Sequence, residues 1–286
     1  MSLIGTLLTL IICLALLVTL VTHLLFFYET RSSGGYASWL SRLDCGPGRA
    51  LLRSVLQGWG SQTLVAILYP LGLIRGVFFP RPSRMPEDSA PPLIIMLVHG
   101  LYHNPTGWLH FRHRLLRTGH RHVCAYGYSS WKEDFHELAE GLRQAILAAA
   151  ACHPRARVVL VGHSLGGLLS RYCASMEDVR DRLAGVVTLG TPHQGSKLAS
   201  LGIGRLALSL EYEGAVVQAV KQHEQPIRCP ALSLFSPTDN FVFPEDALRI
   251  QAKGWVEEQT PIMSHVAMLF HPAVFARILA FLRNLH

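Results

Sequence analysis

The sequence has few charged residues for its length. Only 16% of its 286 residues are Asp, Glu, Lys or Arg, whereas 50% are hydrophobic, and an ordinary soluble domain carries about 25% charged residues. Residues 1–28 contain none of these four charged types. A hydrophobic share this high excludes a disordered or collagen-like chain, and the length allows one large domain or two small ones.

Sequence patterns for metal sites and disulfide scaffolds are missing as well. The six cysteines are scattered without a C-x-x-C pair, so neither a zinc site nor a disulfide framework is indicated. Histidines crowd residues 99–122, but none of their pairs combines i,i+4 spacing with a neighbouring Glu, the pattern of zinc hydrolases. We therefore expect no metal and no organic cofactor. The arginines of that stretch are expected on a solvated face or against anionic lipid headgroups, and no motif for nucleic-acid binding accompanies them.

A long apolar segment opens the chain. Residues 3–28 contain one readily ionisable side chain, His23, and as a helix would be about 39 Å long at about 1.5 Å per residue, enough to span a bilayer. A cleaved signal peptide has a positively charged start and a shorter apolar core of about 7–15 residues. We therefore predict that residues 1–28 are a retained transmembrane anchor.

The next two segments are less regular. Residues 29–61 form a juxtamembrane connector rich in Gly and Arg, with a short interfacial helix expected near residues 51–56. A second apolar run, residues 62–79, is close to the minimum length for a span and is interrupted by Arg75. It is either a second span, which we favour, or a helix that lies on the membrane or packs on the domain. Residues 80–92 are a Pro-rich, polar linker.

The number of spans decides the side on which the remainder of the chain lies. The connector has more positive than negative side chains, so the positive-inside tendency places it in the cytoplasm. One span then leaves the following domain cytoplasmic, whereas two spans return it to the exoplasmic or periplasmic side. The charged side chains that enter this comparison are Arg31, Arg42, Arg49 and Arg53 against Glu29 and Asp44.

From residue 93 onward, short apolar runs alternate with amphipathic stretches. Continuous apolar strands separated by helices are typical of a parallel sheet that is covered on both faces. We therefore predict an α/β domain at residues 93–286. The expected strands are 93–98, 122–128, 158–161, 183–189, 231–235 and 254–256, and the expected helices include 134–151 and 165–176.

A serine motif lies between a predicted strand and a predicted helix. Gly162, His163, Ser164, Leu165 and Gly166 form a G-x-S-x-G sequence. On a tight strand-to-helix turn the serine Oγ is exposed, and the flanking glycines remove the Cβ atoms that would clash there. This placement predicts that Ser164 is a catalytic nucleophile.

The motif resembles the nucleophile elbow of the α/β-hydrolase family, in particular its lipases and lipase-like esterases. Two other segments share the resemblance: His99 and Gly100 match the H-G of the lipase oxyanion loop, and residues 189–196 resemble the T-P-H-x-G of lipases and of the lipase-like GPI inositol deacylases. The resemblance covers residues 91–286. It implies an α/β-hydrolase fold, a mostly parallel sheet with helices on both faces.

The family order of catalytic residues is serine, then acid, then histidine. Asp239 lies on the loop that follows the carboxyl end of the predicted strand 231–235. In open α/β sheets, ligands bind at the carboxyl ends of the strands. We predict Asp239 as the acid, with Asp246 in reserve. His265 precedes the last amphipathic helix and is predicted as the base, whereas His271, followed by Pro, is typical of a helix entry.

Together these residues predict a membrane-anchored serine hydrolase of lipid or other acyl esters, with the backbone N–H groups of Leu101 and Leu165 as the oxyanion hole. An acyltransferase or thioesterase with the same triad is the alternative, and a non-catalytic scaffold is a third. The apolar residues 194–228 are interpreted as an acyl-binding lid, or else as a helical excursion that covers the core. Chain length, headgroup and oligomeric state stay open.

Overall fold

The computed structural model describes residues 2–285 except residues 74–78, 81 and 87–90. Its centre is a six-stranded sheet in the order β2-β1-β3-β4-β5-β6, with every neighbouring pair parallel. The predicted strands 93–98, 183–189 and 231–235 are confirmed to the residue, and the other three differ by a few residues at their ends. The strands are β1 (Leu93–Val98), β2 (Val123–Tyr126), β3 (Arg157–His163), β4 (Leu183–Leu189), β5 (Ala231–Phe235) and β6 (Trp255–Gln259).

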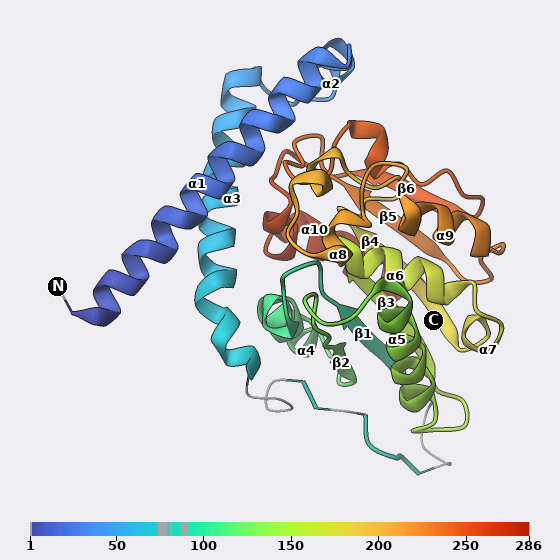
Figure 1. The fold of residues 1–286 in the computed structure, drawn as a ribbon. Coiled ribbons are helices and arrows are strands. Elements are labelled where there is room, and N and C mark those ends of the chain that lie inside the picture. Colours follow the sequence, from blue (N-terminus) through green and yellow to red (C-terminus); the bar gives the residue numbers. More distant parts are fainter. Residues whose placement is uncertain (1, 74–78, 81, 87–90, 286) are drawn as a thin grey trace.

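Helices cover both faces of this sheet, which confirms the predicted fold class (Figure 1). Because side chains alternate across a strand, Ile94 and Met96 of β1 pack in the core formed with α5 and α6, whereas Ile95 and Leu97 pack in the core formed with α4 and α10. Strand β1 is therefore apolar throughout, whereas the edge strand β6 contains Glu257, Glu258 and Gln259 and is partly exposed. The helices of this part are α4 (Leu109–Arg117), α5 (Phe135–Ala150), α6 (Leu165–Ala174), α7 (Glu177–Arg180), α8 (Arg205–Leu208), α9 (Ala215–His223) and α10 (Pro272–Arg283).

Before the sheet, the described residues form the helices α1 (Leu3–Ser32), α2 (Tyr36–Ser41) and α3 (Pro47–Leu68), followed by a 3₁₀ turn at Tyr69–Leu73. Figure 1 shows α1 crossing α3, with its N-terminal end pointing away from the sheet. Most apolar side chains in the first half of α1 are exposed. Within the described residues, α1 alone is long and apolar enough to cross a membrane, a property shared by anchors and signal sequences.

The helix ends in this region differ from the segment boundaries expected from the sequence, and the division into anchor, connector and second apolar run stays a prediction. Helix α1 continues to Ser32, past the expected end of the anchor at residue 28. The short helix expected near residues 51–56 is part of α3, which runs without a break across the predicted boundary between residues 61 and 62. The structure therefore gives no separate helix for the start of the second apolar run, and residues 74–78 of that run lie outside the described residues.

The N-terminal helices also pack directly on the sheet domain. The indole N–H of Trp39 donates to the Pro237 carbonyl oxygen at 2.9 Å, and Gln259 Nε2 donates to the Arg42 carbonyl oxygen at 3.1 Å. Val65 of α3 is buried in the same core as α4 and α10. Trp39, Arg42 and Val65 therefore join the N-terminal helices to the sheet domain. For residues 62–79, packing on the domain was one of the expected alternatives.

Candidate active site

Ser164 occupies a strained turn between β3 and α6. Its backbone has φ 55° and ψ −125°, a region that a residue with a Cβ rarely adopts. Two glycines make the turn possible: a Cβ at Gly162 would lie 2.4 Å from the Gly166 carbonyl oxygen, and one at Gly166 would lie 2.3 Å from the Val98 carbonyl oxygen. The local sequence therefore raises Ser164 above the end of the sheet, as the G-x-S-x-G motif predicts.

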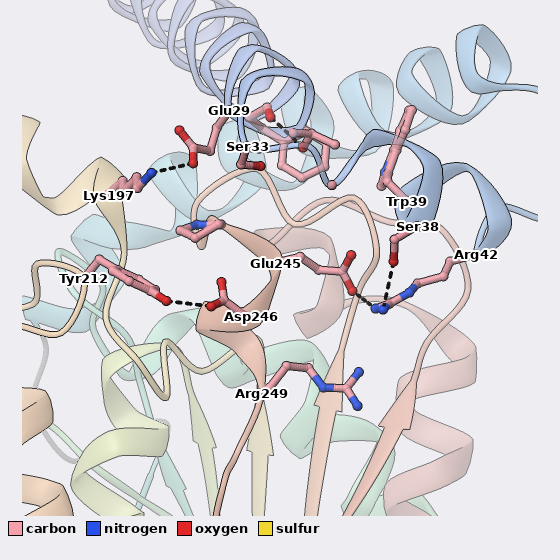
Figure 2. Close-up of a pocket in the computed structure, with 14 residues that line it drawn as sticks. Glu29, Ser33, Ser38, Trp39, Arg42, Lys197, Tyr212, Glu245, Asp246 and Arg249 are labelled. Carbon is pink, nitrogen blue, oxygen red and sulfur yellow. Dashed lines mark hydrogen bonds and ion pairs between the residues drawn. The ribbon is translucent and has the colours of Figure 1, made fainter.

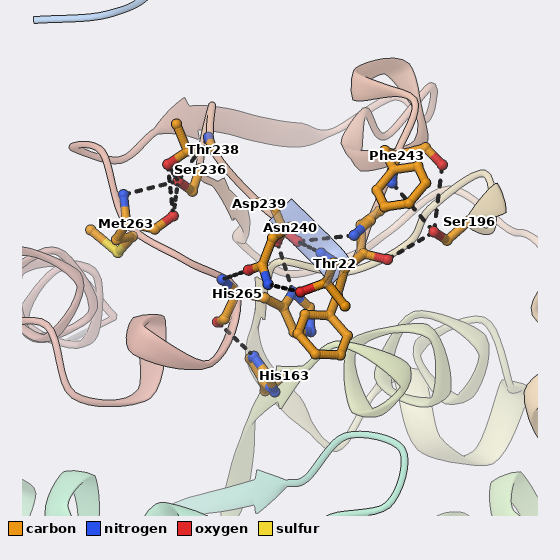
Figure 3. Close-up of polar contacts among 12 residues, drawn as sticks. Thr22, His163, Ser196, Ser236, Thr238, Asp239, Asn240, Phe243, Met263 and His265 are labelled. Atoms are coloured by element: carbon orange, nitrogen blue, oxygen red, sulfur yellow. Dashed lines mark hydrogen bonds and ion pairs between the residues drawn. The ribbon is translucent and has the colours of Figure 1, made fainter. Parts of the chain in front are cut away.

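Asp239 and His265 form a buried hydrogen-bonded pair. His265 Nδ1 lies 2.7 Å from Asp239 Oδ2, and both side chains are at most 5% exposed. The other carboxylate oxygen, Asp239 Oδ1, accepts hydrogen bonds from the backbone N–H groups of Phe241 and Val242 at 3.0 Å each. Since Asp239 follows β5 and His265 follows β6, the parallel sheet brings both to one edge, where their side chains meet (Figure 3). Ser164 follows β3 at the same edge. The carboxylate faces Nδ1, which leaves Nε2 of the imidazole as the proton-accepting nitrogen.

The reserve acid Asp246 lies elsewhere. Its Oδ2 accepts the hydroxyl hydrogen of Tyr212 at 2.6 Å, and both line a separate cavity between α1, α2 and the domain (Figure 2). The charged side chains of that cavity are paired, as in the ion pair of Lys197 with Glu29 at 2.6 Å. This cavity is therefore a polar seam between the N-terminal helices and the domain.

Ser164 and His265 open into one cavity of about 490 Å³. Leu198, Leu201 and Ile203, from the segment expected to be a lid, contribute much of its apolar lining. The Ile203 side chain is also 72% exposed, so this part of the segment forms the cavity rim.

The two halves of residues 194–228 differ in their surroundings. The first half lines the cavity, whereas Val216, Val217 and Val220 of α9 are buried in the domain. The second half is therefore the helical excursion over the core that was the alternative interpretation. Tyr102 holds the first half in place: its hydroxyl donates to the Ile203 carbonyl oxygen at 2.6 Å and accepts from the Ile203 N–H at 2.8 Å.

The loop after β1 lies against the serine. A Cβ at Gly100 would be 3.0 Å from Ser164 Cβ, and Leu101 lines the same cavity. Leu165 is the first residue of α6, where backbone N–H groups have no partner inside the helix. The hydrogen bonds between described residues use neither the Leu101 N–H nor the Leu165 N–H.

The motif histidines His99 and His163 are buried supports of this loop and turn. The His99 ring stacks on Tyr128 at 3.9 Å between centroids, and its Nε2 accepts the Tyr128 backbone N–H at 3.3 Å. Burial lowers the pKa of His99 to about 3, so the ring is neutral at pH 7. His163 Nε2 lies 3.2 Å from the His265 carbonyl oxygen, and burial holds the pKa of His163 well below its usual range. A neutral His163 therefore donates to the backbone of the predicted base.

Two residues that support the Asp239–His265 pair were not predicted from the sequence. Gly190 has φ 52°, and a Cβ there would lie 2.9 Å from Asp239 Oδ2 and 3.0 Å from His265 Nδ1. Asn240 is fully buried, and its Oδ1 accepts the His265 backbone N–H at 3.1 Å. Gly190 belongs to the segment that resembles the lipases and was identifiable from it. Asn240 adjoins the acid, but no local pattern indicates its contact with His265.

Metal-binding clusters are not found in the described part of the chain, where no three His, Cys, Asp or Glu side chains gather. The expectation that the protein works without a metal or cofactor stays a prediction.

A family model agrees with this geometry. Residues 95–282 match the model described as the alpha/beta hydrolase family. A probable esterase of Oryza sativa subsp. indica is 35% identical over 108 residues, 36% of this chain and 40% of that protein. A triacylglycerol lipase of Pseudarthrobacter phenanthrenivorans is 41% identical over 63 residues, 22% of this chain and 18% of that lipase. The chain thus matches less than half the length of these two relatives.

Solved structures agree on the fold. The mature Bacillus licheniformis lipase BlEst2 has a TM-score of 0.56 at 19% identity, over 71% of this chain and 95% of that one. The crystal structure of a membrane phospholipase A, a novel bacterial virulence factor, has a TM-score of 0.51 at 20% identity, over 83% of this chain and 97% of that one. At these identities the two structures bear on the fold alone.

The acid can be tested by exchanging each carboxylate for an amide. Asp239→Asn should lower kcat for ester hydrolysis by about 10⁴-fold, because the amide stabilises the wrong imidazole tautomer, as the same change does in a serine protease triad. Asp246→Asn, the matched control in the other cavity, should stay within about threefold of wild type. Steady-state kinetics on a short-chain ester measures both variants. A near-normal Asp239→Asn enzyme with a strongly impaired Asp246→Asn enzyme would mean that the acid is Asp246.

Proposed function

The chain belongs to the alpha/beta hydrolase family, and from this membership we propose that it is a serine hydrolase of carboxylic esters. The observation that carries the proposal is the shared cavity: the strained Ser164 turn and the buried Asp239–His265 pair open into the same apolar space. A serine beside a histidine that a carboxylate orients is the arrangement that activates a hydroxyl for attack on a carbonyl. The esterase and lipase names of the two partial relatives support the same reaction class.

The proposed reaction has two halves. Ser164 Oγ attacks the ester carbonyl carbon while His265 Nε2 accepts the hydroxyl proton, and the resulting imidazolium returns that proton to the leaving alcohol. Asp239 keeps the proton on Nδ1 and stabilises the positive imidazolium. Water then attacks the acyl-enzyme with the same help from His265, which releases the acid and restores Ser164.

The oxyanion forms beside the turn that carries the serine. The backbone N–H groups of Leu101 and Leu165 are the proposed donors, because one lies on the loop packed against Ser164 and the other begins α6. One such donor contributes about 2.7–4 kcal/mol of transition-state stabilisation. The positive end of the α6 dipole acts in the same direction.

We propose lipid or other apolar acyl esters as the substrates. The cavity rim formed by Leu198, Leu201 and Ile203 offers apolar contact to a hydrocarbon chain. Tyr102 joins this rim to the loop of the proposed oxyanion donor Leu101. Residues 197–204 are therefore the proposed lid, and α9 is excluded from it because its apolar side chains already fill the core.

We further propose that α1 is a retained anchor and the single span of the protein. A second span would place the connector and the domain on opposite sides of the membrane. Contacts of Trp39 with Pro237 and of Arg42 with Gln259 instead join the connector to the domain, which favours the one-span alternative over the two spans preferred from hydropathy. With the positive charges of residues 29–61, the proposal places the domain in the cytoplasm.

Ser164→Ala tests the proposed reaction. The substitution removes only the hydroxyl from the turn, so the protein should fold while kcat for ester hydrolysis falls by about 10⁴-fold or more. Turnover of a series of p-nitrophenyl esters by the purified full-length chain, with its thermal melting as the folding control, measures the effect. More than a few per cent of wild-type turnover in a pure preparation would refute Ser164 as the nucleophile.

Reporters joined after His286 test the single-span proposal. In bacterial cells a fluorescent protein that matures only in the cytoplasm should fluoresce, and alkaline phosphatase at the same position should stay inactive. The catalytic variant Ser164→Ala gives the matched background for any toxicity of the hydrolase. Active phosphatase without fluorescence would place the domain outside and restore the two-span alternative.

A further inference from the structure

Two residues of the cavity wall come from helices that precede the matched family region. Val18 of α1 and Gln62 of α3 line the cavity together with Ser164 and His265, although the family match begins at residue 95. Gln62 Nε2 donates to Thr19 Oγ1 of α1 at 2.9 Å, so the two helices are tied together at this wall. The space in which an ester must lie is thus incomplete without the N-terminal helices.

A buried chain of hydrogen bonds joins the same face of α1 to the proposed catalytic base. The Thr22 hydroxyl donates to the Val18 carbonyl oxygen at 2.8 Å and accepts from Asn240 Nδ2 at 2.6 Å. Asn240 Oδ1 in turn accepts the His265 backbone N–H at 3.1 Å (Figure 3). Thr22 and Asn240 are both buried, so water would not replace the hydrogen bond between them if it were lost.

The helices also approach the base closely through α3. A Cβ at Gly58 would lie 3.1 Å from Thr19 Cγ2 and 3.2 Å from the Cβ of Ser264, the residue before His265. One turn earlier on α3, the Ser54 hydroxyl donates to the Thr238 carbonyl oxygen, beside the acid, at 3.3 Å. The N-terminal helices therefore contact the loops of both the acid and the base. A helix that served only as a membrane anchor would need neither contact.

We propose that α1 is part of the active site and not only an anchor. Val18 forms a wall of the subsite for the acyl chain of the ester, and Thr22 is a positioning residue that holds His265 through Asn240. This inference rests on the proposed ester hydrolysis and adds to it a determinant of acyl-chain length.

The wall is tested by two tryptophan substitutions at adjacent positions of α1. Val18→Trp narrows the cavity at the proposed acyl wall, so kcat/KM for esters of long-chain acids should fall about tenfold or more, while acetyl and butyryl esters change less than about threefold. Leu17→Trp is the matched control, because the Leu17 side chain is 58% exposed and outside the cavity lining. It should keep the wild-type ratio of long-chain to short-chain kcat/KM. If Val18→Trp leaves the ratio of long-chain to short-chain kcat/KM unchanged, or if both variants change it equally, Val18 is not a wall of the acyl subsite.

The positioning role is tested by removing one hydroxyl. Thr22→Val keeps the shape of the side chain but leaves Asn240 Nδ2 without its acceptor, so kcat on a short-chain ester should fall about tenfold with KM unchanged, and Thr22→Ser should restore it. Thr30→Val is the matched control, since among the described residues the Thr30 hydroxyl donates to the Phe26 carbonyl oxygen of the same helix, at 2.8 Å, and not to the catalytic loops. A lowered melting temperature with normal kcat in Thr22→Val would overturn the positioning role.

The outcomes separate this inference from the proposed function. All variants are measured in the full-length chain in detergent micelles, beside Ser164→Ala. Wild-type turnover that depends on Ser164, with no effect of Val18→Trp or Thr22→Val, would overturn the inference and leave the function intact. Absence of ester hydrolysis by the wild-type chain would overturn both.

Discussion

The buried hydrogen bond between Asp239 and His265 is the interaction on which the site depends. It joins the loops after β5 and β6, and the neighbouring residues hold its two partners in place. Gly190 adopts a positive φ where a Cβ would strike both partners. Two backbone N–H groups hold the second carboxylate oxygen, and Asn240 holds the backbone of the histidine. A carboxylate without exposure to solvent is tolerated only because each of its oxygens has hydrogen-bond partners.

Much of the fold could be predicted from the sequence because buried strands appear in it as short runs of apolar residues. Strands covered on both faces are mostly apolar, and the ends of β1, β4 and β5 were predicted to the residue. Strands β2 and β6 have partly exposed side chains, and their predicted ends differ by a few residues. Ser164 was identifiable because its turn needs glycines at fixed spacing. The acid and base were predicted from chain order and from the rule that parallel strands present their carboxyl ends at one edge.

The rest depends on contacts between distant residues. Thr22 and Asn240 are 218 positions apart, and neither has a local pattern that predicts the contact. Hydropathy divided residues 29–79 at the ends of apolar runs, whereas α3 continues across one of these divisions. It packs a face of mostly small residues, among them Ala50, Ser54, Gly58 and Ser61, on α1 and the domain. An exposed apolar helix and a helix docked on a protein surface have similar compositions, so only packing separates them. The same packing gives the N-terminal helices a place in the cavity wall.

Ser164, activated by His265, is the proposed nucleophile of an ester hydrolase, and the other proposals about the reaction depend on this role. Covalent labelling tests this claim most directly. The full-length protein is treated with a fluorophosphonate, which reacts with activated serines, and the modified peptide is identified by mass spectrometry. We predict one adduct, on Ser164, that forms at least about a hundredfold more slowly in His265→Ala, because the hydroxyl then has no base. An adduct on another residue, or ester turnover that continues in a protein without an adduct on Ser164, would contradict it.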